Sequence, residues 1–445
     1  MKKVLVSAII ATFTVPAYLS AAVTVDTVAE LQSALNSKQK RIYVDGTLKY
    51  SGSTPLVLKG KGHRVYADGN NTVLHVTNGA DLKVSGLRFI GPGGYSYDDS
   101  NPNQSLGGNA ILLTTPAIKI DESGEDDPLF DKVVKVEIYN TSVRGFGDHG
   151  IHLSDCSDLS CGDGNDAGGF GTSASFDVKL TKVTVMNTGF GQQDADGIRV
   201  DERSDGSVNL VAKNIWLRNV GADGIEIDEA GDGDVIVKMK NANFVDNGSY
   251  CGQADQEALF NVYTEARSVA EPFENKDLEK EFLEDFAGRY DCVDEIDTDE
   301  EGKDQVVFDL DDAFDIDEAD RGSVSVEMKN IRIFSNDDEG LDFDEDKDGD
   351  ITLDAQNIIM ANNGDEGIKL SEEDDGDVNL TVKKLTNGRG EADDIEVESE
   401  DDGAGSVTIN NAKIDDLKIT GTVNCDLSNV KFDGKIKDDG CANLP

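Results

Sequence analysis

The sequence predicts an all-β solenoid, in which short strands wind into coils that stack on one another. Three observations support this: a repeat of about 27 residues, apolar–polar alternation of period two within each repeat, and Gly, Asn and Asp between the alternating runs. No stretch inside the repeats has the apolar stripe of a helix. Each unit therefore holds about three short strands, and stacked units are expected to form three parallel sheets around a narrow core.

The repeat is marked by a D-G-apolar-x-apolar-acid pattern that occurs as ADGIRVDE and ADGIEIDE, one period apart. DEGLDFDE, DEGIKLSE and DDIEVESE continue it at the same spacing, DDAFDIDE precedes them by one period, and DHGIHLSD is an earlier copy. A much longer interval separates ADGIEIDE from DDAFDIDE, because an insertion lies between them. The slot before the first apolar residue is occupied in turn by Gly150, Gly197, Gly224, Ala313, Gly340, Gly367 and Asp394.

The N-terminus has the composition of a secretory signal peptide. Lys2 and Lys3 precede an apolar run at 4–15, and small residues at 20–22 suit a signal peptidase. About 12 apolar residues are too few to span a bilayer. We therefore expect a signal peptide at 1–22, and a single β-helix domain at 23–445 that is secreted to the periplasm or the exterior.

Six cysteines lie beyond the signal peptide, which suits disulfides in an exported chain. Neighbours in sequence suggest the pairs Cys156–Cys161, Cys251–Cys292 and Cys425–Cys441, although six cysteines permit 15 pairings. A zinc site is the competing interpretation. The spacing lacks a paired CxxC pattern, and the four histidines do not cluster with the cysteines.

The chain resembles the right-handed parallel β-helices of the pectate-lyase-like superfamily. VDTVAELQSALNS at 25–37 has the pattern of an N-terminal capping helix, with Val28, Leu31 and Leu35 on one face, and the segment at 70–92 resembles early coils of that superfamily. An asparagine column at one turn is typical of such helices, because each amide can bond to the next. One slot here holds Asn214, Asn241, Asn330, Asn357, Lys384 and Asn411.

Two insertions interrupt the repeat. Residues 155–176 form a Gly- and Ser-rich loop, and residues 249–310 contain helical apolar spacing that suggests two or three short helices held by Cys251–Cys292. Long insertions in solenoids often flank a binding site, but a decoration without a binding role is equally compatible. Residues 415–445 are expected to form a final coil and a disulfide-bearing cap.

Stacking would turn the repeated acids into columns with rungs about 4.8 Å apart. Unit charges at that spacing repel by roughly 1 kcal/mol per pair in water, so cations are expected between them. Calcium suits oxygen-rich turns. The alternative is a solvated acidic face, as in salt-adapted proteins. The expected metal ligands are Asp201, Asp228, Asp232, Asp234, Asp317, Asp344, Asp348, Asp350, Asp375 and Asp377.

The outward position of the DGI strand forms a further column: His152, Arg199, Glu226, Asp315, Asp342, Lys369 and Glu396. The resemblance implies a substrate groove there, with His152, Arg199 and Glu226 as candidate catalytic residues of a polysaccharide lyase or glycoside hydrolase. The companion GHG and RIK motifs of polygalacturonase-type hydrolases are missing, however. Nearly every coil also carries the same acidic pattern.

The formal charge of −48 disfavours nucleic acid and free polyuronates as partners, and no other segment is apolar enough to cross a membrane. The sequence leads to one main hypothesis and two alternatives. The first is a secreted, calcium-binding β-helix that recognises extracellular polysaccharide or a cell-surface component. The second is a lyase or hydrolase acting on an acidic glycan, and the third is a purely structural surface protein.

Overall fold

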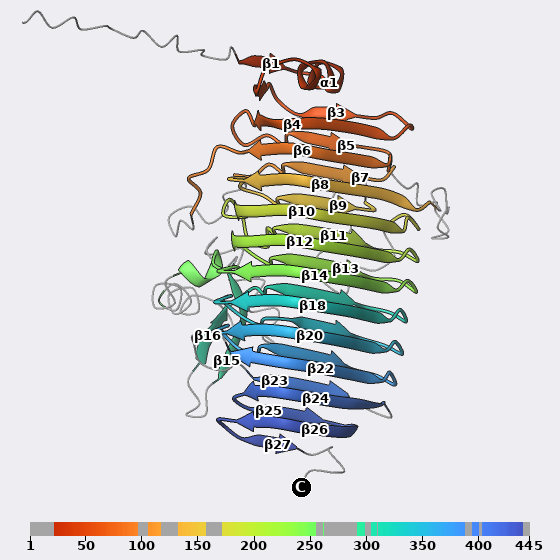
Figure 1. Cartoon of the computed structure of the whole chain (residues 1–445), viewed down its shortest axis with the longest axis vertical. Coiled ribbons are helices and arrows are strands. Elements are labelled where there is room, and N and C mark those ends of the chain that lie inside the picture. The colour runs from red at the N-terminus through yellow and green to blue at the C-terminus, as the bar shows by residue number, and fades with distance from the viewer. Residues whose placement is uncertain are drawn as a thin grey trace, which may run out of the picture.

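The computed structural model describes residues 22–96, 106–116, 132–156, 171–254, 261, 292–298, 304–308, 310–387, 394–399 and 403–438. They form a column of stacked coils, capped at one end by α1 (Val28–Asn36), with β27 at the other end (Figure 1). All neighbouring strands of the two large sheets run parallel. The fold is the right-handed parallel β-helix that the sequence predicts.

The first sheet has 13 strands, and each pairs with the corresponding strand of the next coil. In order, they are β1 (Val23–Val25), β2 (Arg41–Val44), β4 (Leu56–Tyr66), β6 (Leu82–Ile90), β8 (Val134–Arg144), β10 (Phe176–Thr188), β12 (Val208–Val220), β14 (Val235–Val245), β18 (Val324–Phe334), β20 (Ile351–Ala361), β22 (Val378–Asn387), β24 (Ala404–Ile414) and β26 (Thr422–Phe432).

The second sheet has 12 strands and contains the DGI segments. In chain order, they are β3 (Leu48–Tyr50), β5 (Leu74–Val76), β7 (Ile111–Thr114), β9 (Ile151–Ser154), β11 (Ile198–Glu202), β13 (Ile225–Glu229), β17 (Phe314–Glu318), β19 (Asp342–Glu345), β21 (Ile368–Glu372), β23 (Ile395–Ser399), β25 (Leu417–Thr420) and β27 (Ile436–Asp438).

The three sheets expected from the repeat appear as two hydrogen-bonded sheets, because the long strands continue through a corner. In β12, Ala212 and Ile215 both point inward, and the exposed pair between them breaks the alternation. Asn214 at this break has φ 54°, in the left-handed region. Inward side chains on both sides of the corner join one apolar core that runs the length of the column.

The asparagine column predicted from the sequence occupies this corner. Asn241 Nδ2 donates to Asn214 Oδ1 at 2.9 Å, Asn330 donates to Asn241 at 2.9 Å, and Asn357 donates to Asn330 at 2.7 Å. Asparagine tolerates left-handed backbone better than other non-glycine residues, and its amide both donates and accepts. The column therefore satisfies polar groups at a position where the strand must turn.

The N-terminal helix is also confirmed. α1 begins after Thr27, whose hydroxyl accepts a hydrogen bond from the Glu30 N–H at 3.3 Å, and it buries Val28, Leu31 and Leu35. This apolar face covers the first coil. No helix in the described residues has the length and apolarity needed to cross a membrane.

The 249–310 insertion is only partly described. Cys251 is bonded to Cys292, as predicted, beside the short 3-10 helix η2 (Cys251–Gln253). The predicted helices fall almost entirely outside the described residues, whereas β15 (Val293–Thr298) and β16 (Asp304–Phe308) form an antiparallel hairpin that the sequence pattern did not predict. Cys161 and Cys441, the expected partners of Cys156 and Cys425, also lie outside the described residues.

A buried glutamate column runs along the inner edge of the second sheet, where register pairs Glu202, Glu229, Glu318, Glu345 and Glu372 in sequence. One carboxyl oxygen of each accepts a backbone N–H from its own turn, for example that of Gly349 at 3.0 Å from Glu345 and that of Gly376 at 2.8 Å from Glu372. The other oxygen is buried among neighbouring carboxyl groups. Burial and the adjacent glutamates raise the pKa of Glu229 to about 12 and that of Glu345 to about 9.

This column predicts that the chelator-treated protein is more stable at pH 5 than at pH 8. A glutamate ordinarily titrates near 4.3, so the folded state retains protons that the unfolded chain releases. The resulting stabilisation is complete below that value and is lost as the pH rises through about 7, the pKa of Glu202 and Glu372, toward about 9. Melting temperatures across this range measure it.

Glu345→Gln keeps the oxygen that accepts the backbone N–H and removes the titrating proton. It should raise the melting temperature at pH 8 by several degrees and flatten the pH profile. The exposed Glu373 provides a matched control, since Glu373→Gln removes the same charge outside the column. Identical profiles for the two variants would contradict a proton-sharing column.

Candidate metal centre

The outward column of the second sheet is assembled as the alignment of the repeats within this chain predicts. Register pairs His152 with Arg199, Arg199 with Glu226, Glu226 with Asp315, and Asp315 with Asp342, with Lys369 and Glu396 on the next two rungs. The step from Glu226 to Asp315 crosses the long insertion without loss of phase. The first five of these side chains, from His152 to Asp342, line an acidic cleft with a volume of about 750 Å³.

The cleft is lined by twelve carboxylates, two guanidinium groups and the imidazoles of His149 and His152. The carboxylates belong to Asp148, Asp194, Asp201, Asp223, Glu226, Asp228, Asp311, Asp312, Asp315, Asp317, Asp342 and Asp344, and the guanidinium groups belong to Arg199 and Arg203. So many like charges in one partly buried space require neutralisation by protons, by basic side chains or by bound cations. Ion pairs to basic side chains provide part of this neutralisation.

Arg199 neutralises one end of the cleft. Its buried guanidinium contacts Asp194 at 2.8 Å, Glu226 at 2.7 Å and Asp228 at 2.7 Å. Its Nε donates to Asp201 Oδ1 at 2.7 Å, and Asp201 Oδ2 lies 2.5 Å from His152 Nε2. Burial opposes the charged form of Arg199, but these carboxylates outweigh it and raise its pKa well above the usual value. These contacts therefore favour the charged form of the guanidinium.

Lys369 neutralises the other end. Its Nζ lies 2.7 Å from Asp342 Oδ2, 3.7 Å from Glu339 and 4.0 Å from Asp344. Although burial lowers the pKa of the ammonium group, these carboxylates raise it above its ordinary value, so Lys369 also remains charged.

The middle of the cleft has no such partner. No basic side chain in the described part of the chain forms an ion pair with Asp223, Asp312, Asp315 or Asp317. Asp312 is only 7% exposed, and its Oδ1 is buried without a hydrogen-bond partner. Burial and the neighbouring carboxylates raise the pKa of Asp312 and of Asp315 well above the ordinary value, and that of Asp317 to about 7.

Carboxylate oxygens converge here in overlapping triads, each with its ligand atoms within 4.8 Å of one another. Asp223, Glu226 and Asp315 form one triad, and Asp312, Asp315 and Asp342 form the next. Two flanking triads extend the array: Asp194–Asp196–Glu226 and Asp312–Asp338–Glu339. Because the donors are all carboxylate oxygens, the array suits a hard cation such as Ca²⁺ or Mg²⁺, and it contains no sulfur or imidazole ligand that would favour zinc.

The structure brings together only part of the ligand set predicted from the sequence. Asp201, Asp228, Asp317 and Asp344 all line the cleft, and Asp201 and Asp228 are paired there with Arg199. The D-G-D turns lie elsewhere: Asp350 Oδ1 accepts the Asp377 N–H at 2.9 Å, and Asp377 Oδ1 accepts the Ala404 N–H at 3.0 Å. Asp234 likewise accepts the backbone N–H of Ser323, and Asp232 forms an ion pair with Arg321. Asp348 and Asp375 belong to the same D-G-D turns.

The sequence analysis missed the acids that precede each DGI strand: Asp194, Asp196, Asp223, Asp312, Asp338 and Glu339. The signal was present, because the slot before the glycine holds Asp196, Asp223, Asp312 and Glu339 in successive copies. Asp194, Asp223 and Asp312 line the cleft, and Asp196, Asp338 and Glu339 have ligand atoms within 4.8 Å of those of cleft carboxylates. The repeat is more regular in the acids that follow each DGI strand, and the predicted ligands were therefore chosen among those.

No protein-family profile matches the chain, and no curated protein matches its sequence. Among solved structures, the enzymatically active domain of bacteriophage CBA120 tailspike protein 2 is similar to 88% of this chain, with 13% identity and a TM-score of 0.43. The full-length tailspike protein 2 from an Escherichia coli O157:H7 bacteriophage is similar over 88% of the chain, with 11% identity and a TM-score of 0.40. The matches cover 43% and 39% of those longer chains.

Asp312→Asn should weaken calcium binding about tenfold or more, because it removes a charged ligand that belongs to two triads. Calorimetric titration of the chelator-treated protein with Ca²⁺ measures this. Asp348→Asn is the control, since Asp348 is exposed and its substitution removes the same charge from a D-G-D turn. If Asp348→Asn weakened binding and Asp312→Asn did not, the ions would belong to the turns instead.

Proposed function

We propose that this chain is a secreted calcium-binding β-helix whose acidic cleft recognises an extracellular polysaccharide through bound metal. The observation that carries the proposal is the absence, among the described residues, of a basic partner for Asp223, Asp312 and Asp315, in a cleft where Arg199 and Lys369 neutralise only the two ends. A cation of charge two placed among these oxygens would relieve repulsion that no described side chain relieves through an ion pair.

Calcium in such a site retains open coordination positions. It takes six to eight oxygens in flexible geometry, and three carboxylates supply only part of that number when each binds through one atom. The remaining positions can accept hydroxyl or carboxylate oxygens of a sugar. A cleft of about 750 Å³ falls in the size range of ligand pockets, and the bridging ion would allow an anionic glycan to approach an acidic wall.

Catalysis is the alternative, with His152, Arg199 and Glu226 acting in a polysaccharide lyase or glycoside hydrolase. Arg199 contributes little to that alternative, because four carboxylates within 2.8 Å hold it in the charged form. Glu226 hydrogen-bonds to this guanidinium at 2.7 Å, and His152 Nε2 is engaged by Asp201. The three groups thus have partners within the protein, which favours binding over chemistry.

Glycan binding at the acidic cleft should require calcium. We expect immobilised pectin, alginate or a glycosaminoglycan to retain more of the protein in millimolar Ca²⁺ than in excess chelator. Asp312→Asn should lose this calcium-dependent retention, and Asp348→Asn should keep it. Retention by none of the glycans, with calcium binding intact, would contradict the glycan part of the proposal while leaving the metal centre in place.

The same incubations distinguish the enzyme from the binding protein. Formation of unsaturated uronates or of new reducing ends, abolished in both His152→Ala and Arg199→Ala variants that still fold, would establish catalysis and overturn the proposal of binding alone. The proposal predicts that neither product forms with any of these substrates.

A further inference from the structure

One face of this acidic column carries no carboxylate. It consists of the strand segments that follow the corner of the first sheet in the first eight coils, and we call it the carboxylate-free face. The segments are 41–44, 63–66, 87–90, 141–144, 183–186, 215–218, 242–245 and 331–334, and none contains Asp or Glu. The chain as a whole has 89 acids in 445 residues, so their absence from these eight segments separates the charges sharply.

Basic residues gather at the N-terminal end of this face. Register pairs Arg41 with Arg64, Arg64 with Arg88, and Ile90 with Arg144 on the neighbouring line. The four arginines are exposed, and none forms an ion pair with an acid in the described part of the chain. Arg218, further along, does pair with Asp246, at 3.4 Å.

Like charges on adjacent rungs repel by roughly 1 kcal/mol per pair in water, at a spacing of about 4.8 Å. In the acidic cleft, Arg199 and Lys369 offset part of such repulsion, but the arginine row has no described counter-charge. Guanidinium groups bind carboxylate and sulfate oxygens in planar, two-pronged geometry. The row therefore presents evenly spaced oxyanion sites along the column axis.

Aromatic rings flank the arginines. Tyr43 and Tyr66 stack with ring centroids 4.8 Å apart, and Tyr43 is 41% exposed. Trp216, on the same line as Arg64 and Arg88, is 47% exposed. Exposed rings beside charged groups suit sugar rings, whose C–H faces pack on aromatic faces while their substituents reach the arginines.

Two adjoining cavities extend the row into a groove. The smaller, of about 320 Å³, is lined by Arg64, Arg88 and Arg144. The larger, of about 740 Å³, shares Ile90, Arg144 and Met186 with it. Arg144 therefore lines both cavities, which adjoin on the same face.

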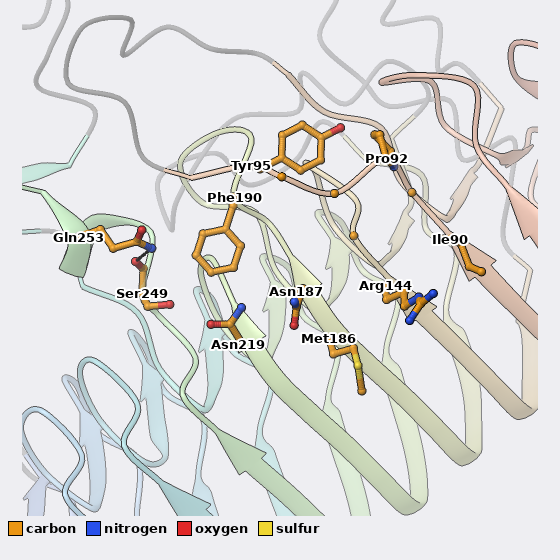
Figure 2. Close-up of a pocket in the computed structure, with 14 residues that line it drawn as sticks. Ile90, Pro92, Tyr95, Arg144, Met186, Asn187, Phe190, Asn219, Ser249 and Gln253 are labelled. Atoms are coloured by element: carbon orange, nitrogen blue, oxygen red, sulfur yellow. Dashed lines mark hydrogen bonds between the residues drawn. The ribbon is translucent and has the colours of Figure 1, made fainter.

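Figure 2 shows the larger cavity, with Arg144 and Ile90 at one end, Asn187 and Asn219 between them and Ser249, and Tyr95 above. Asn187 and Asn219 have φ values of 53° and 51°, and their side-chain amides make no hydrogen bond within the described residues. Tyr95 is fixed by its hydroxyl, which donates to Asn70 Oδ1 at 2.7 Å. The groove thus offers neutral hydrogen-bonding groups next to the charged row.

We propose that the carboxylate-free face binds an anionic polysaccharide, with Arg41, Arg64, Arg88 and Arg144 contacting its carboxylate or sulfate groups and Tyr43 and Tyr66 packing on its rings. The chain of sugars lies along the column axis, and no metal ion takes part. The anionic character of the partner follows from this face, whereas its identification as a polysaccharide rests on the proposed function. The surface is separate from the acidic cleft.

The test is carried out in excess chelator, which removes any calcium-mediated binding. Fluorescently labelled polygalacturonate and dextran sulfate serve as carboxylated and sulfated probes, neutral dextran as the uncharged control, and single-stranded oligothymidylate as a polyanion of another class. Arg64→Gln with Arg88→Gln should weaken binding of at least one anionic glycan by about tenfold per arginine. Lys213→Gln with Lys238→Gln removes the same charge before the corner and should change it less than twofold.

The two glycan probes identify which anion the arginines prefer. Equal weakening in the two double variants would show a general charge effect and overturn the proposal, as would the absence of anionic-glycan binding in chelator. Tighter binding of the oligothymidylate than of either glycan would replace the polysaccharide with nucleic acid. Binding that appears only with calcium and disappears in Asp312→Asn would place the glycan in the acidic cleft and overturn the proposal for the arginine row. The two proposals are therefore contradicted by different results.

Discussion

In-register stacking is the constraint on which the rest of this structure depends. When each coil lies directly above the last, every slot of the repeat becomes a column of similar side chains about 4.8 Å apart. A column is stable only if its members tolerate like neighbours. Apolar residues do so by packing, as Phe314 does between Phe244 and Phe343, and asparagine amides do so by donating to one neighbour and accepting from the other.

Ionisable columns need a further solution, and two are visible here. The buried glutamates hold protons, as the raised pKa of Glu345, about 9, indicates. The ends of the acidic cleft are neutralised by Arg199 and Lys369. The centre of the cleft has no basic partner among the described residues, and burial raises the pKa of Asp312 and Asp315, so these carboxyl groups hold protons when no cation is bound. The arginine row on the carboxylate-free face has no described counter-charge. We attribute both to ligands: a divalent cation for the carboxylates and an oxyanion-bearing glycan for the arginines.

The sequence predicts the fold well because a repeat contains its own register. The spacing of the DGI segments placed Glu226 opposite Asp315 across the insertion, and the corner asparagines were identified from a single slot. The sites were harder to predict. The cleft depends on which acids lack a basic neighbour, and Asp312 looks like any other acid until the contacts of Arg199 and Lys369 are known.

The arginine row was also not predicted from the sequence. Arg41, Arg64 and Arg88 belong to three separate coils, and their local contexts do not resemble the repeat. Basic and aromatic residues alternate locally in RIY at 41–43 and in RVY at 64–66, but only the stacking of the coils brings these two pairs side by side. The hairpin at β15 and β16 was missed for a local reason: DEIDTDEEGKDQVV reads as an acidic loop, and its strands pair only with each other.

The most direct measurement of the central claim is an anomalous-scattering map from crystals of the protein soaked with a lanthanide that substitutes for calcium. In-register stacking with an unneutralised centre predicts ions bound by Asp223, Glu226, Asp312, Asp315 or Asp342, at the triads between Arg199 and Lys369. Density confined to the D-G-D turns, or no bound ion at saturating lanthanide, would contradict it.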